Sequence, residues 1–153
     1  RGLHRLQAES SGNIVRFWDS ECGVLNERGV KFGEISDGTS NTILLFEMAG
    51  KPIHWHLGQQ REVTNAQFYG HGPWAGNNGV GIFNWAQDGS AMGCNTCNRY
   101  INVNNQVSPY SFHPGVVMIV LVDGSTTTLS DSIDSELFSN LCRKQDGNVI
   151  GAF

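Results

Sequence analysis

Tyr110–Leu129, YSFHPGVVMIVLVDGSTTTL, is the stretch that decides the fold. Its apolar run, Val116–Val122, is rich in β-branched residues, which favours a strand over a helix. Asp123-Gly124 is typical of a tight hairpin turn, and the residues after it supply a returning strand. Because the run is continuous rather than alternating, we expect both of its faces to be buried. This hairpin should form the centre of an antiparallel sheet.

The composition indicates one domain over residues 1–153, with residues 1–13 frayed. Charged residues make up only 16% of the chain, and glycine and asparagine are frequent, which predicts many turns and few long helices. The asparagine-rich, weakly charged surface that we expect would suit an exported protein. The net charge of −4 offers no basic surface for nucleic acid, which excludes a dedicated nucleic-acid binder. Because the chain starts at Arg1, we expect it to be a processed or trimmed piece.

The other elements can be placed around this hairpin. Thr42–Glu47 is predicted as a buried strand. Lys51–Leu57 alternates, which places Trp55 with its apolar neighbours on one face and two histidines on the other. Residues 70–105 form a long glycine-rich excursion, and Asp134 is predicted to cap a C-terminal helix. The predicted fold is α+β: mainly antiparallel sheet, a C-terminal helix and long Gly/Asn-rich loops.

His113 and Asp123 suggest a shared catalytic or metal site, but the spacing argues against it. Ten residues of strand place the two side chains roughly 30 Å apart, at opposite ends of the apolar strand. We therefore interpret His113-Pro114-Gly115 and Asp123-Gly124 as turn-forming corners. No nucleophile elbow is present either, so we predict no catalytic residues and no cofactor.

His54 and His56 have a spacing that chelates a transition metal if His71 or His113 supplies a third nitrogen. Two histidines that flank a buried tryptophan are more often a solvated strand face. We therefore predict no metal, with His54, His56 and His71 as the weak candidates.

Four cysteines permit up to two disulfides in three pairings. Cys94-x-x-Cys97 fits a redox pair, half a zinc knuckle or a local disulfide, and a local disulfide in an exported protein is the interpretation that we favour. Cys22 and Cys142 are either a second disulfide or two buried thiols.

Aromatic residues in and around the long excursion offer an alternative function. Trp74, Trp85 and Tyr100 would stack on sugar rings if they line a surface. An extracellular glycan- or solute-binding module that uses residues 70–105 is therefore the main alternative. Because most tryptophans in a chain of this size are core residues, we rank it second.

The spacing of His113, nine residues and Asp123-Gly124 resembles the signature of a bacterial prepilin-type, processing-associated family named for it. ISDGTSNTILLFEMAGKP (Ile35–Pro52), GPWAGNNGVGIF (Gly72–Phe83) and the closing SDSIDSELFSNLCRKQDGNVI are similar to that family's other segments. Phe46 and Val116 stand where the family usually has glycine. The residues that match its motif, all interpreted as structural, are Asp37, Gly38, Thr39, Ser40, Asn41, Thr42, Glu47, His113, Pro114, Gly115, Asp123 and Gly124.

The resemblance implies a pilin-like globular head that lacks the N-terminal prepilin leader and apolar helix. It implies a non-catalytic structural subunit, or a surface-displayed head, of a protein related to type IV pili or type II secretion. The partners would be other pilin-like subunits or further copies of the chain, with the membrane reached only through the absent helix. The location would be the periplasm or the cell surface.

Overall fold

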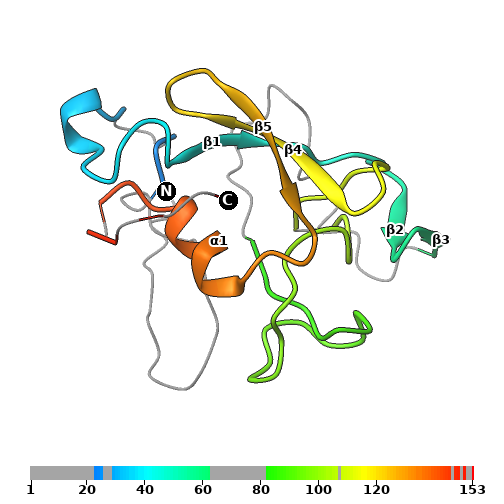
Figure 1. The fold of residues 1–153 in the computed structure, drawn as a ribbon. Helices are drawn as coiled ribbons and strands as arrows, with labels where there is room; N and C mark the ends of the chain where they lie inside the picture. The colour runs from blue at the N-terminus through cyan, green and yellow to red at the C-terminus, as the bar shows by residue number, and fades with distance from the viewer. Residues whose placement is uncertain are drawn as a thin grey trace, which may run out of the picture.

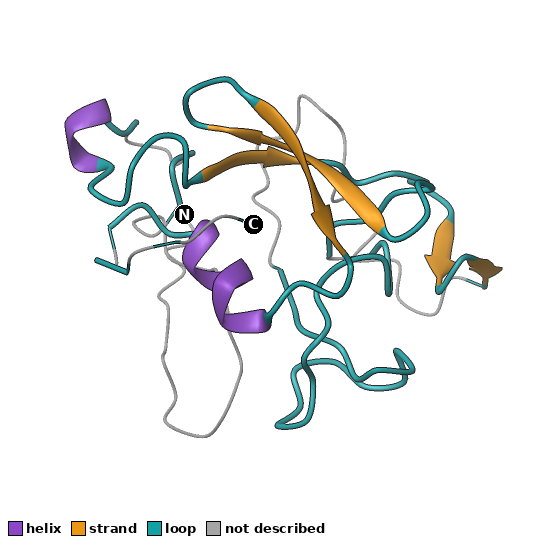
Figure 2. Cartoon of the chain, viewed as in Figure 1, coloured by secondary structure: helices purple, strands orange, loops and turns teal. Residues whose placement is uncertain are grey.

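The computed structural model describes residues 23–25, 29–62, 82–106, 108–145, 147–148, 150 and 153. The fold is α+β and mainly antiparallel sheet, as predicted, and Figure 2 shows that loops join short elements. The elements are η1 (Phe32–Glu34), β1 (Ile43–Phe46), β2 (His54–His56), β3 (Gln59–Arg61), β4 (Val116–Leu121), β5 (Thr126–Ser130) and α1 (Ser135–Leu141).

The central hairpin is formed by β4 and β5, as predicted from the sequence. They pair antiparallel from Val116 opposite Ser130 to Val120 opposite Thr126, and β1 pairs with the other edge of β4. The three strands lie in the order β1-β4-β5 (Figure 1). The turn depends on Gly124, whose φ of +85° is in the left-handed region that favours glycine.

Only one face of β4 is buried, so the prediction that both faces are covered is wrong. Val117, Ile119 and Leu121 are at most 5% exposed, whereas Met118 is 39% exposed. The reason is that α1 and the loop around Tyr100 pack on a single face of the sheet, which lies above α1 in Figure 1. A continuous apolar run therefore gives an alternating pattern of burial.

The C-terminal helix α1 supplies the other half of the core. Phe138 and Leu141 are buried against the sheet, and the Phe138 ring lies 4.9 Å from that of Tyr100. Asp134 is the N-cap, as predicted. Its carboxylate accepts hydrogen bonds from two backbone N–H groups of the first turn, at 2.9 and 3.0 Å.

Within Lys51–Leu57 only His54–His56 is a strand, β2, and it pairs with β3 in a hairpin. Leu57 and Gly58 both have positive φ, which is the geometry of a two-residue hairpin turn. The faces are also reversed: His54 is buried, whereas Ile53 and Leu57 are 44% and 39% exposed. The turn at Leu57 ends the alternation on which the prediction rested.

Truncating side chains on the two faces of β5 should have different effects on stability. Leu129→Ala should lower the free energy of unfolding by about 2–5 kcal/mol, because it leaves a cavity in the core. Thr128→Ala, one residue away on the exposed face, should change it by less than about 0.5 kcal/mol. Urea unfolding measures both, and equal effects would contradict this placement of the core.

Candidate functional site

The first motif segment, residues 37–42, is a loop held by its own polar groups. Gly38 has a φ of +96°, and its carbonyl accepts hydrogen bonds from the Asn41 N–H at 3.1 Å and from Thr42 Oγ1 at 3.0 Å. Asn41 Nδ2 also donates to Asp37 O at 3.3 Å. The dense run of Asp, Gly, Thr, Ser and Asn therefore forms a closed turn immediately before β1.

This loop is joined to the Asp-Gly turn of the central hairpin. The Asp123 N–H donates to Thr39 O at 3.0 Å, and the Val122 N–H donates to Thr42 O at 3.0 Å. The structure therefore brings together two motif segments that are about eighty residues apart in the chain.

The Asp123 carboxylate is used within its own turn. One of its oxygens accepts hydrogen bonds from the Ser125 N–H at 2.8 Å and from Ser125 Oγ at 2.6 Å. These bonds lower the pKa of Asp123. The exposed carboxylate thus serves as a turn-forming group.

Glu47 extends the pairing of β1 and β4 beyond the end of β1. Its N–H donates to Met118 O at 2.9 Å, and its Oε2 accepts from the Met118 N–H at 3.3 Å. Its carbonyl accepts from the Tyr110 N–H at 3.1 Å. This motif glutamate therefore takes a backbone role at the strand end.

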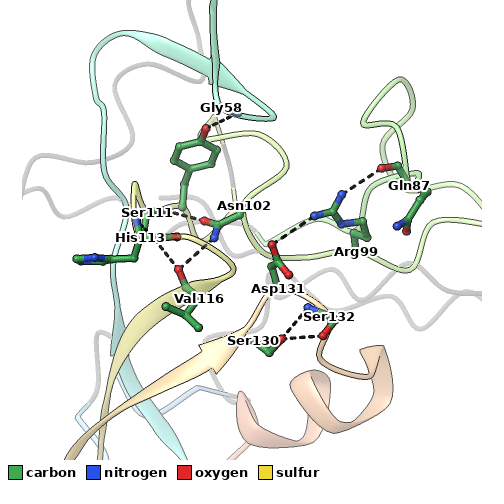
Figure 3. A network of polar contacts seen from close by, with 11 residues as sticks. Gly58, Gln87, Arg99, Asn102, Ser111, His113, Val116, Ser130, Asp131 and Ser132 are labelled. Carbon is green, nitrogen blue, oxygen red and sulfur yellow. Dashed lines mark hydrogen bonds and ion pairs between the residues drawn. The ribbon is translucent and has the colours of Figure 1, made fainter.

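The His-Pro-Gly motif forms the turn that leads into β4, at the opposite end from Asp123. The His113 N–H donates to Ser111 Oγ at 3.0 Å, and Gly115 has a φ of +73°. The imidazole of His113 is exposed and points away from the polar network in Figure 3. His113 and Asp123 are therefore not gathered into one site.

Two asparagines, one partly and one fully buried, are site residues that were not predicted from the sequence. Asn102, which has a φ of +58°, accepts from the Ser111 N–H at 2.8 Å and donates from Nδ2 to Val116 O at 3.1 Å (Figure 3). Asn105 is fully buried. Its Oδ1 accepts from the Trp55 N–H at 2.9 Å, and its Nδ2 donates to the carbonyls of Ala49 and Ile53 at 3.1 and 2.8 Å.

These two side chains connect β2 and β4 to the long excursion. The frequency of asparagine was the available signal, but it suggested an exposed surface. Asn84, Asn104 and Asn105 are instead all at most 5% exposed.

The two histidines of β2 do not form a solvated face. His54 is 7% exposed, and its Nδ1 lies 3.1 Å from Glu62 O. The His56 ring is packed against Gly89, where an added Cβ would overlap Nε2 and lie 2.9 Å from Val103 Cγ1. Within the described ranges no three His, Cys, Asp or Glu side chains are grouped to hold a metal ion, and His71 lies outside those ranges.

Burial is the main reason why the pKa of His56 is below its usual value. The positive charge of Arg61 and the neighbouring His54 act in the same direction, whereas the backbone and carboxylate of Asp88 oppose it. Nε2 of His56 is buried and has no hydrogen-bond partner among the described residues. A positive charge on the His56 ring is therefore only partly offset by Asp88, and a proton on Nε2 has no described hydrogen-bond acceptor.

The predicted local disulfide is present between Cys94 and Cys97. Cys97 is buried, and its sulfur accepts a hydrogen bond from the Cys94 N–H at 3.0 Å. Cys142 is a free thiol in the part of the chain that is described, and burial raises its pKa to about 12. Cys22, its predicted alternative partner, lies outside the described residues.

Two of the three rings considered for ligand stacking are buried in the structure. Trp85 and Tyr100 are 6% and 2% exposed, so neither presents a face to a ligand. The Trp85 indole donates to Ser108 Oγ at 2.8 Å, and burial raises the pKa of Tyr100 to about 12. The Trp85 ring is thus buried with Ser108 as its hydrogen-bond partner, and the Tyr100 ring belongs to the hydrophobic core. Trp74 lies outside the described residues.

The motif residues thus define a class of small α+β domain in which conspicuous polar residues hold loops to a three-stranded sheet. The chain belongs to the family described as "Protein of unknown function (DUF1559)", whose model matches residues 3–136. No curated protein and no solved structure matches the chain. Among the described residues, no helix is long and apolar enough to cross a bilayer.

Substituting the turn glycine should weaken the link between the motif segments. Gly124→Ala forces a Cβ into the left-handed region and should cost about 1–2 kcal/mol of unfolding free energy. Gly33→Ala is the matched control, because Gly33 lies in η1 with nothing within 4 Å of an added Cβ. Thermal or urea unfolding compares the two variants, and an unaffected Gly124→Ala would contradict the role of the turn.

The lowered pKa of His56 predicts an acid-sensitive stability. The unfolded chain binds a proton at His56 more readily than the folded chain does. The contribution of neutral His56 to the free energy of unfolding is therefore complete above its ordinary pKa of about 6.5, and it is lost as the pH falls below that value. Urea unfolding between pH 7 and pH 5 should show this loss in the wild type and in the exposed-site control His113→Gln. The free energy of unfolding should depend less steeply on pH in His56→Gln.

An NMR titration of the wild-type histidines tests the same point if His56→Gln does not fold. The His56 ring should titrate below pH 6.5. A midpoint at or above that value would contradict the assigned burial.

Proposed function

We propose that this protein is a non-catalytic, surface-displayed head domain of a pseudopilin-like protein, related to subunits of type IV pili or type II secretion. Its working surface in this proposal is the uncovered face of the main sheet. We define this outer face by the residues Leu45, Val116, Met118, Val120, Thr126 and Thr128.

The outer face is the observation that carries the proposal. Leu45 is 51% and Met118 39% exposed, and Val116 and Val120 are half-buried. A shallow hollow of about 250 Å³ lies over β1 and β4. An apolar strip on the centre of a sheet is a surface that normally packs against another element. An apolar pilin-type helix would cover it, while α1 already covers the opposite face.

The positions of the motif residues support the same proposal. They are used in turns and strand pairing, and the motif histidine and aspartate lie at opposite ends of β4. Motif residues that stabilise the fold are consistent with a subunit that has a structural role. The Cys94–Cys97 disulfide is compatible with export to the periplasm or the cell surface.

The solute-binding alternative loses support from its described residues. Trp85 and Tyr100 belong to the interior, which leaves Trp74 as the ring on which that hypothesis depends. We therefore rank it below the structural role.

A photo-crosslinking experiment in the native bacterium tests the structural role. A photoreactive amino acid at Met118 in the full-length gene product should crosslink to a pilin-like helix, of the same protein or of a neighbouring subunit. Gln60 of β3 is the control position, because it is exposed and belongs to the other sheet.

Mass spectrometry of the crosslinked peptide identifies the partner. Crosslinking at Met118 to nothing, or only at the level seen from Gln60, would contradict the proposal. So would a crosslink to a soluble substrate or a bound glycan.

A further inference from the structure

β5 is hydrogen-bonded to β4 along one side of its backbone. The Leu121 N–H donates to Ser125 O at 2.9 Å, and the Asp131 N–H donates to Gly115 O at 2.8 Å. These two bonds bracket the strand and fix which of its residues face β4. Because bonded pairs alternate in an antiparallel ladder, every second residue from Ser125 to Asp131 faces β4.

Thr126, Thr128 and Ser130 consequently direct their backbone groups away from the sheet. The Ser130 carbonyl accepts from the Ile133 N–H at 3.1 Å. The N–H and C=O of Thr126 and of Thr128 have no partner within the described part of the chain. Two donors and two acceptors thus alternate along an open edge, and both threonine side chains are exposed.

Within the described residues, this edge lacks several of the features that normally keep strand edges apart. Natural edge strands are protected by charged side chains, proline, bulges or a covering element. β5 has the sequence TTTLS, without a charge or a proline, and its pairing with β4 is regular along its length. Threonine also has a high preference for strands. The described part of this edge is therefore open to pairing with another strand.

We propose that β5 pairs antiparallel with β5 of a second copy of this chain. The register follows from the free groups. Placing Thr126 opposite Thr128 of the partner subunit, and the reverse, uses all four unpartnered groups of each copy. It forms four hydrogen bonds across a twofold axis that passes beside Thr127 and joins two three-stranded sheets into one.

A second copy fits this edge because the edge is complementary to itself. In antiparallel pairing the sequence of donors and acceptors on Thr126 and Thr128 matches its own reverse. Acidic residues lie just beyond both ends of β5, at Asp123 and Asp131. In this register each Asp123 approaches the partner subunit's Asp131, which already has Arg99 at 3.7 Å to offset its charge.

This inference rests on the proposed function, in which the domain assembles with other subunits. It adds a twofold dimer to that proposal. A twofold contact uses the same surface on both copies and closes on itself. Pairing through β5 therefore produces a dimer, and any extension into a filament would use a different surface, such as the outer face.

Sedimentation of the purified chain over a broad concentration range is the first test. The wild type should show a monomer–dimer equilibrium. Thr128→Pro should be monomeric, because proline removes an outward N–H that β4 does not use. Leu45→Lys, on the outer face of β1, should dimerise like the wild type. A monomeric wild type, or a Thr128→Pro variant that still dimerises, would overturn the inference.

A cysteine crosslink tests the register even if Thr128→Pro does not fold. In this register the two Thr127 residues of the dimer lie opposite each other as a non-hydrogen-bonded pair. Their Cα atoms would be about 4.5 Å apart, which is within the range of disulfides. Oxidised Thr127→Cys should give a covalent dimer, whereas Ser130→Cys should not. Equal yields from the two variants would overturn the register and the pairing.

The two proposals fail separately. Dimers through Thr127 without a helix crosslink at Met118 would refute the pilin-like role alone. A Met118 crosslink in a chain that stays monomeric would refute the β5 pairing alone.

Discussion

The structure depends on one constraint. Buried backbone N–H and C=O groups need hydrogen-bond partners even in a segment that contributes no strand to a sheet. Residues 82–106 and 108–110 form no strand of β1–β5, yet much of this segment is buried. A buried N–H or C=O without a partner costs about 1–3 kcal/mol. Backbone hydrogen bonds satisfy part of the segment, and side-chain amides and hydroxyls supply further partners, with Asn105 alone binding three backbone groups.

This arrangement also explains how the main sheet keeps its position. Asn102 and Ser111 both donate to the Val116 carbonyl where β4 begins, at 3.1 and 2.5 Å. At the other end of β4, the loop before β1 accepts hydrogen bonds from the hairpin turn. The central hairpin is therefore held at both ends by irregular segments, and the family motif marks several of these attachment points.

Local chemistry allowed much of this to be predicted. The β-branched run, the Asp-Gly turn, the Asp134 cap and the Cys94–Cys97 disulfide each depend on neighbouring residues, and all four are found. The misjudged features depend on distant contacts. Whether Met118 is covered depends on what packs over the sheet, and the burial of His54 depends on the turn at Leu57.

The asparagines show most clearly why the remainder could not be predicted. Asn105 and an exposed loop asparagine look alike in a sequence, because nothing local shows that Ala49, Ile53 and Trp55 will come within reach. The same holds for Trp85, whose buried indole requires Ser108 as its partner. Polar composition could be read from the sequence, but the side on which each polar group would lie could not.

The burial of Cys142 has a kinetic consequence. Thiol–disulfide exchange proceeds through the thiolate, which makes up a few per cent of an ordinary cysteine at neutral pH. With its pKa raised to about 12, Cys142 would hold a far smaller share of thiolate at neutral pH. Cys142 would therefore attack the Cys94–Cys97 disulfide only very slowly.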